Sequence, residues 1–162
     1  MTKTYRVSRR LTIPEEIKVE IAGRKIKIEG PKGTLTKDFT HIKNINIKKE
    51  DNEIIVETYF PKKKDRAIVG TVAGHINNMI KGVTKGFKYR LKIVYAHFPA
   101  SVKIDGKNIL IENFIGEKVA RKTKMVGDVQ IKVKEDEIII EGTDIENVSQ
   151  TAANIENATK IR

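Results

Sequence analysis

The chain contains no cysteine in its 162 residues. This absence excludes disulfide bonds, thiolate metal sites and cysteine nucleophiles together. The sequence also has no apolar run of the roughly 18 residues that identify a membrane-spanning helix. The basic residues 1–10 are not followed by the apolar core of an export signal. We therefore expect a soluble intracellular protein that does not enter a membrane.

Sequence motifs of several enzyme classes are missing as well. There is no GxxxxGK phosphate loop, no GxGxxG dinucleotide motif, no HExxH zinc motif and no GxSxG nucleophile elbow. His41, His75 and His97 stand apart from one another, and none has a carboxylate at the spacing of a metal-binding pair. We therefore expect no enzymatic activity, no cofactor, no metal and no small-molecule substrate.

One dense acidic cluster is present, at residues 135–137. Convergent carboxylates could hold the metal ions of a nuclease, so this cluster defines the enzymatic alternative. Acidic residues recur at positions 50–53, however, and both clusters lie between two strand-like runs. A repeated acidic hairpin tip is most simply a solvated turn.

The net charge is strongly positive. Lysine and arginine number 32 against 21 acidic residues, which gives +11 and a pI near 9.7. Residues 1–82 carry 18 basic and 10 acidic side chains, and residues 83–162 carry 14 and 11. A balance of this size indicates a polyanionic partner.

Two parts of the chain resemble each other. IPEEIKVEIAGRKIKIEG, from Ile13, recurs as FPASVKIDGKNILIEN, from Phe98. INIKKEDNEIIVET, from Ile45, recurs as VQIKVKEDEIIIEG, from Val129, and GTVAGHINNMIKG recurs more weakly as SQTAANIENATK. The matches keep their order at nearly constant offsets, so one module of about 80 residues occurs twice.

Alternating apolar residues predict two β-hairpins in each copy. They are expected between residues 17–21 and 26–28, 45–47 and 54–56, 102–104 and 109–111, and 129–133 and 138–140. Asp105-Gly106, between the strands of the third hairpin, is a favoured two-residue turn.

A helix follows the second hairpin of each copy. Apolar residues at three- and four-residue spacings predict a core-facing stripe over residues 64–81, with Gly82 as the stop. Gly70 and Gly74 suggest that this helix lies close against a sheet. A smaller stripe over residues 145–155 predicts the second helix, capped by Thr143 or Asp144.

Each copy is therefore predicted to be an α+β unit, a small twisted antiparallel or mixed sheet with one packed helix. The natural boundary lies near residue 83, which gives two similar domains, residues 1–82 and 83–162. Residues 87–95, which include Arg90, are expected to form a long joining strand with one apolar and one cationic face.

Lys62, Lys63 and Lys64 open the first predicted helix. Their charge opposes the helix dipole at that end, a cost that is tolerated more readily when a polyanion neutralises them. A solvated charge run is an equally good explanation.

The run GEKVARKTK, residues 116–124, is the most informative basic segment. It has only one acidic residue beside Lys118, Arg121, Lys122 and Lys124. The first copy has no comparably basic run at this place, and a shared scaffold does not explain a difference between copies. We therefore interpret this segment as a phosphate-binding loop and expect it to matter more than Lys62 and Lys63.

The segments PEEIKVEIAGRKIKIEGPKGTL and RAIVGTVAGHINNMIKGVTKGFKYRLKIVYAHFP resemble the large-subunit ribosomal protein L6 family in its archaeal form. NILIENFIGEKVARK and VSQTAANIENATKIR are similar to that family's second domain. The resemblance covers nearly the whole chain from about Leu11.

This resemblance implies two α+β domains from a gene duplication and a cytoplasmic scaffold on the ribosome. It implies a position near the sarcin–ricin loop and the stalk base, where translation factors dock. Large-subunit rRNA and neighbouring large-subunit ribosomal proteins are the implied partners, with the second domain as the main rRNA binder. In archaeal relatives a basic extension usually begins at about the place of Lys160 and Arg162. We therefore add these two residues to the candidate rRNA contacts. The basic arm at residues 1–12 has no clear counterpart, and we expect it either to order on RNA or to remain a solvated terminus.

Two alternatives belong to other functional classes. A stand-alone basic architectural protein would bind duplex DNA, and competition between DNA and rRNA fragments at physiological salt distinguishes it from an rRNA binder. A nuclease would cleave RNA with added magnesium and lose that activity when Glu135 and Asp136 are replaced.

Overall fold

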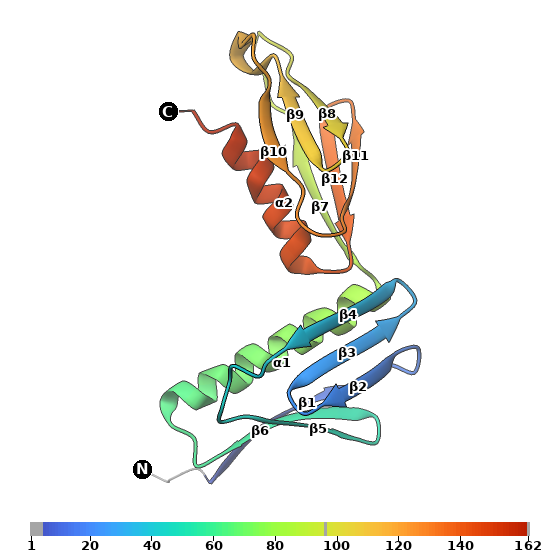
Figure 1. Ribbon diagram of the computed structural model, residues 1–162, viewed down its shortest axis with the longest axis vertical. Coiled ribbons are helices and arrows are strands. Elements are labelled where there is room, and N and C mark those ends of the chain that lie inside the picture. Colours follow the sequence, from blue (N-terminus) through green and yellow to red (C-terminus); the bar gives the residue numbers. More distant parts are fainter. Residues whose placement is uncertain (1–4, 96, 162) are drawn as a thin grey trace. The chain divides into compact units, whose positions relative to one another are not determined.

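The chain folds as two units of the same design, residues 1–85 and 86–162 (Figure 1). The computed structural model describes residues 5–95 and 97–161. The boundary lies three residues beyond the expected one, because the first helix continues past Gly82. The α+β class with two similar units is confirmed.

In its described part, residues 5–85, the first unit contains two three-stranded antiparallel sheets and one helix. In spatial order, one sheet is β2 (Lys18–Ala22), β3 (Lys25–Gly30) and β4 (Gly33–Asp38); the other is β1 (Arg6–Thr12), β6 (Glu53–Tyr59) and β5 (Asn46–Glu50). Helix α1 spans Lys63–Thr84. It packs against strands of both sheets.

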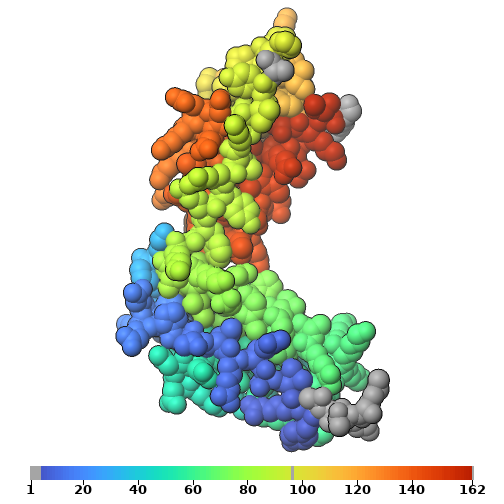
Figure 2. Space-filling view, turned by 180° about the vertical axis from the view of Figure 1, so that it is seen from behind, coloured from blue at the N-terminus to red at the C-terminus, as the bar shows by residue number. Residues whose placement is uncertain are grey.

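The second unit repeats this plan. Its sheets are β8 (Ser101–Asp105), β9 (Asn108–Glu112) and β10 (Arg121–Lys124), and β7 (Phe87–Lys92), β12 (Glu137–Gly142) and β11 (Gln130–Lys134). A short 3-10 helix spans Phe114–Gly116, and helix α2 spans Ile145–Ala158. Figure 2 shows β7 as an accessible strand on the surface of this unit, between the orange strands and the red helix.

All four predicted hairpins are confirmed, as β2–β3, β5–β6, β8–β9 and β11–β12. Their apolar residues lie in register, with Ile47 opposite Val56 and Ile104 opposite Ile109. The fully buried side chains come from the central strands and the helices, among them Ile28, Ile54, Ile76, Ile140 and Val148. These side chains form two separate clusters, so each unit has a core of its own. Burial of one such side chain stabilises a fold by about 2 kcal/mol.

The expected basic arm is wrong for the residues that the structure describes. Residues 6–12 form β1, which pairs with β6 and places Leu11 opposite Ile54. Val7 and Leu11 pack on the first core, which explains why this segment joins the fold despite its charge. Residues 1–4 of the predicted arm lie outside the described part.

Helix α1 differs from its prediction in two respects. Gly82 is buried inside the helix, and the left-handed glycine that follows the end is Gly86, with φ of 73°. Gly70 and Gly74 are exposed, with open space where a Cβ would lie, so the predicted close packing through them is wrong. Gly30 supplies the close approach instead, since a Cβ there would lie 2.7 Å from the Cγ2 atom of Val83.

Helix α2 begins as predicted. Asp144 is its N-cap and accepts a hydrogen bond from the Glu146 amide at 2.9 Å. No helix of the described residues is long and apolar enough to cross a membrane.

Candidate nucleic-acid interface

Every sheet turns one face to its core and the other away from the helix. Side chains two positions apart on a strand share a face, and residues directly opposite on a neighbouring strand point to that same face. The strand registers therefore define four outer faces, two on each unit. The charges on these outer faces distinguish the two copies.

The outer face of β8–β9–β10 carries three lysines, Lys103, Lys122 and Lys124, and two acidic side chains, Asp105 and Glu112. Lys122 lies opposite Leu110, and Lys124 lies opposite Asn108. Lys103 is neutralised by Glu112, with its Nζ 2.7 Å from Oε2. Among the residues that the structure describes, no acidic side chain lies within salt-bridge distance of Lys122 or Lys124, so both present their full charge to solvent.

The corresponding face of the first unit, β2–β3–β4, is neutralised within itself. Lys27 contacts Glu29 at 2.5 Å, and Lys25 lies 3.5 Å from Asp38. The hydrogen bond and charge of Lys27 hold the pKa of Glu29 below its ordinary value. By register, Thr36 and Asp38 occupy the places that Lys122 and Lys124 hold in the second unit. At these two places the second unit has lysines where the first unit has a neutral and an acidic residue. Over the whole face, three basic side chains meet three acidic ones in the first unit and two acidic ones in the second.

The second pair of outer faces differs in the same direction. On β7–β12–β11, five basic side chains face two acidic ones: Lys88, Arg90, Lys92, Lys132 and Lys134 against Glu137 and Glu141. On β1–β6–β5, three face three: Arg6, Arg10 and Lys48 against Glu50, Glu53 and Glu57. The predicted cationic face of the joining strand is therefore present, and β7 belongs to the second unit.

A glutamate at the centre of each of these faces belongs to the shared scaffold. Glu57 is only 1% exposed and contacts Arg6 and Lys48, the latter at 3.0 Å. Burial acts to raise the pKa of Glu57, but the hydrogen bonds and charges of Lys48 and Arg6 outweigh it and hold the pKa below its ordinary value.

Glu141 repeats this arrangement in the second unit. Lys88 and Lys132 contact its carboxylate at 3.0 and 3.3 Å, and their hydrogen bonds lower its pKa. Each glutamate joins a central strand to both of its neighbours. On the second unit's face, Arg90, Lys92 and Lys134 remain without an acidic contact in the part of the chain that the structure describes.

Arg121 has a different environment from its neighbours in the predicted loop. The segment is a loop only as far as residue 120, and Arg121 begins β10 with its side chain on the inner side. Its guanidinium forms two hydrogen bonds to Glu117, at 2.6 and 2.8 Å, and lies 4.5 Å from the centre of the Phe114 ring. It also donates to the carbonyl groups of Ala158 and Lys160, at 2.8 and 3.2 Å. These contacts join β10 to the end of α2 and occupy donors that a phosphate would need.

The other predicted contacts are dispersed. Lys118 is exposed on the loop before β10, and Lys160 is exposed just beyond α2. Arg162 lies outside the described residues. Lys62, Lys63 and Lys64 belong to the first unit and are exposed at the start of α1, where Asp65 accepts a hydrogen bond from the Lys62 amide at 2.9 Å. That carboxylate offsets part of the dipole cost that the sequence argument assigned to the lysines.

Sequence reasoning predicted a cationic face of Lys88, Arg90 and Lys92 on the joining strand and named only Arg90 of these as a site residue. It did not connect Lys132 and Lys134, on the same outer face, with them. The sequence could have identified Lys132 and Lys134, because they alternate with apolar residues in a strand that was predicted correctly. Lys103 could have been found in the same way.

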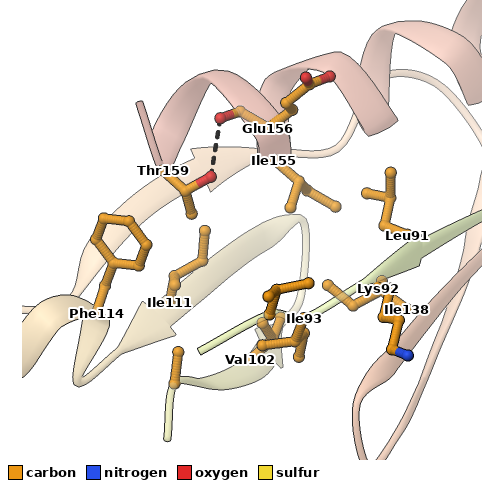
Figure 3. Close-up of a pocket in the computed structure, with 12 residues that line it drawn as sticks. Leu91, Lys92, Ile93, Val102, Ile111, Phe114, Ile138, Ile155, Glu156 and Thr159 are labelled. Atoms are coloured by element: carbon orange, nitrogen blue, oxygen red, sulfur yellow. Dashed lines mark hydrogen bonds between the residues drawn. The ribbon is translucent and has the colours of Figure 1, made fainter. Parts of the chain in front are cut away.

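An apolar cavity of about 420 Å³ opens at one end of the second core. Ile111, Phe114 and Ile155 lie around it (Figure 3), and the Thr159 hydroxyl nearby donates to the Glu156 carbonyl at 2.9 Å. Figure 3 shows the Glu156 carboxylate directed away from the cavity. The lining therefore offers apolar contact and no convergent set of catalytic groups.

The acidic residues at positions 135–137 lie at the tip of the β11–β12 hairpin, as predicted for a turn. Within the described ranges, no group of three or more histidine, aspartate or glutamate side chains could hold a metal ion. The strongest chemical feature of this molecule is thus the unneutralised positive charge on the outer faces of its second unit.

Comparison with known proteins gives full-length matches. A family model described as ribosomal protein L6 matches residues 13–86 and 98–162, one segment in each unit. The large ribosomal subunit protein uL6 of Staphylothermus marinus is 52% identical over 165 residues, which cover 100% of this chain and 89% of the relative. The proteins of that name from Aeropyrum pernix and Methanothrix thermoacetophila are each 48% identical, over 100% and 96% of this chain and 89% and 88% of their own lengths.

Proposed function

The chain belongs to the ribosomal protein L6 family, and on that premise we propose that it binds large-subunit rRNA through the outer faces of its second unit. Membership makes it a structural, non-enzymatic constituent of the large ribosomal subunit in the cytoplasm, and the resemblance read from the sequence is confirmed. The stand-alone DNA-binding protein and the nuclease are thereby disfavoured.

The observation that carries this proposal is the charge difference between equivalent faces of the two copies. Both outer faces of the first unit balance their charges, whereas those of the second unit keep Lys122, Lys124 and Arg90 without acidic contacts in the described structure. Side chains of this kind neutralise phosphates and position a protein on folded RNA without reading its sequence.

Within the subunit, we place the chain near the sarcin–ricin loop and the stalk base, beside neighbouring ribosomal proteins and within reach of docking translation factors. The support for this position is the family resemblance. The apolar residues around the cavity of the second unit are compatible with protein neighbours there, since apolar surface is characteristic of the core of a protein interface.

A hydroxyl-radical footprint on large-subunit rRNA tests the proposal. Wild-type protein should protect the sarcin–ricin loop and the stalk base. The double variant K122E/K124E should lose this protection and bind the RNA at least about tenfold more weakly at moderate salt, because each reversal replaces a phosphate contact with repulsion. The pair K62E/K63E should have a smaller effect. Protection elsewhere on the RNA would contradict the position, and equal effects of the two pairs would contradict the role of the second unit.

A further inference from the structure

A cluster of three exposed aromatic side chains lies where the β1–β6 ladder meets the start of α1. Tyr5, Tyr59 and Phe60 are 62%, 41% and 74% exposed. The Tyr5 ring contacts those of Tyr59 and Phe60 edge to face, with centroids 5.8 and 4.8 Å apart. The Phe60 amide donates to the Tyr5 carbonyl at 2.9 Å, which fixes the two backbones together.

The duplicated scaffold does not require this cluster. None of the three rings belongs to the buried core of the first unit. In the second unit, the equivalent strand β12 leads through Thr143 directly to the α2 cap, Asp144, with no aromatic residue. Phe60 has a φ of 49°, a left-handed conformation that is unfavourable for a bulky side chain. The fold thus keeps a strained, exposed ring at a place where its other copy has none.

The surroundings of the cluster are cationic. Lys62 is two residues from Phe60, so its Cα lies within about 7 Å along the chain, and Lys63 and Lys64 follow. The Arg6 guanidinium lies 5.9 Å from the centre of the Tyr59 ring. The nearby carboxylate of Glu57 is already paired with Arg6 and Lys48, and Asp65 is engaged by the Lys62 amide. Exposed rings therefore stand beside exposed positive charge.

We propose that Tyr5, Tyr59 and Phe60 form a stacking platform for an unpaired RNA base, with Lys62, Lys63 and Lys64 contacting the adjoining phosphates. Aromatic rings interspersed with cations are the means by which proteins hold single-stranded or looped-out nucleotides, since every base has a π face. A protein partner would more readily use rings without a run of three lysines, because lysine is depleted in protein interfaces. The inference rests on the proposed rRNA binding and adds a second contact, from the first unit.

The test uses the full chain and an unstructured 12-nucleotide RNA with 2-aminopurine at one position, whose fluorescence reports stacking. Phe60→Gly removes the ring and suits the left-handed backbone, so the variant should fold at least as well as the wild type by circular dichroism. It should weaken binding about tenfold and abolish the fluorescence change. Tyr95→Leu, at an exposed tyrosine of the second unit, is the matched control and should change neither.

The outcomes separate this inference from the proposed function. If Phe60→Gly binds the oligonucleotide like the wild type, the platform is refuted even when K122E/K124E still loses the rRNA footprint. If the variant keeps oligonucleotide binding but fails to enter large subunits, the cluster contacts a protein, which also overturns the proposal. Loss of stacking together with an unchanged effect of K122E/K124E on the footprint supports both contacts.

Discussion

Arg121 illustrates how a residue's role depends on contacts that its sequence neighbours do not reveal. Sequence reasoning grouped it with Lys118, Lys122 and Lys124 as a phosphate ligand. Its guanidinium instead bonds Glu117 and two carbonyl groups at the end of α2, which lie 37 and 39 residues away. Lys122, the next residue, points to the opposite face of the strand. We therefore expect the removal of Arg121 and the removal of Lys122 to change the free energy of unfolding by different amounts.

We predict that Arg121→Ala lowers the free energy of unfolding by about 1–3 kcal/mol, because it deletes charge-assisted hydrogen bonds and a cation–π contact. Lys122→Ala, on the outer face, should change it by less than about 0.5 kcal/mol. Urea denaturation of the full chain, followed by circular dichroism, measures both. If Arg121→Ala is as stable as the wild type but binds rRNA more weakly, Arg121 is a phosphate ligand, as the sequence predicted, and the structural role is contradicted.

At the scale of elements, the hairpins and helices were predictable because their apolar residues repeat with periods of two or of three to four. Strands β4 and β10, with sequences GTLTKD and RKTK, lack such a repeat and take their pairing from β3 and β9. The sequence also did not show whether Gly70 and Gly74 face the sheets or the solvent. They lie beside the apolar stripe of α1, and their spacing is compatible with either orientation.

The exposure of this glycine pair leads to a stability prediction. Gly70→Ala and Gly74→Ala should each raise the stability of the chain by roughly 0.5–1 kcal/mol, because alanine restricts the unfolded chain and meets open space in the folded helix. Thermal denaturation measures the change.

Gly30→Ala is the matched control for that prediction. Its added Cβ would lie 2.9 Å from the Val83 carbonyl oxygen, a backbone atom that cannot move aside easily. This variant should be destabilised. Loss of stability in the Gly70 or Gly74 variants would mean that the outward face of α1 is packed against something in the native protein.

On the scale of the whole molecule, net charge and charge placement point to different units as the one that presents positive charge to a partner. The first 82 residues carry the larger net positive charge, by eight against three. The strand registers nevertheless show that both outer faces of the first unit balance their charges, while those of the second unit do not. Composition predicts a polyanionic partner, but only the pairing of strands shows which surfaces keep their charge.

The salt dependence of rRNA binding tests this account most directly. The variant K122T/K124D places the first unit's residues at the second unit's positions and removes three units of charge. K32T/K43D removes the same charge from exposed positions of the first unit. We predict that the slope of log K against log salt falls in magnitude by about 2 for K122T/K124D, because two phosphate contacts are lost, and stays unchanged for K32T/K43D. Equal slopes for the two variants would contradict the central claim that the second unit's outer faces hold the RNA.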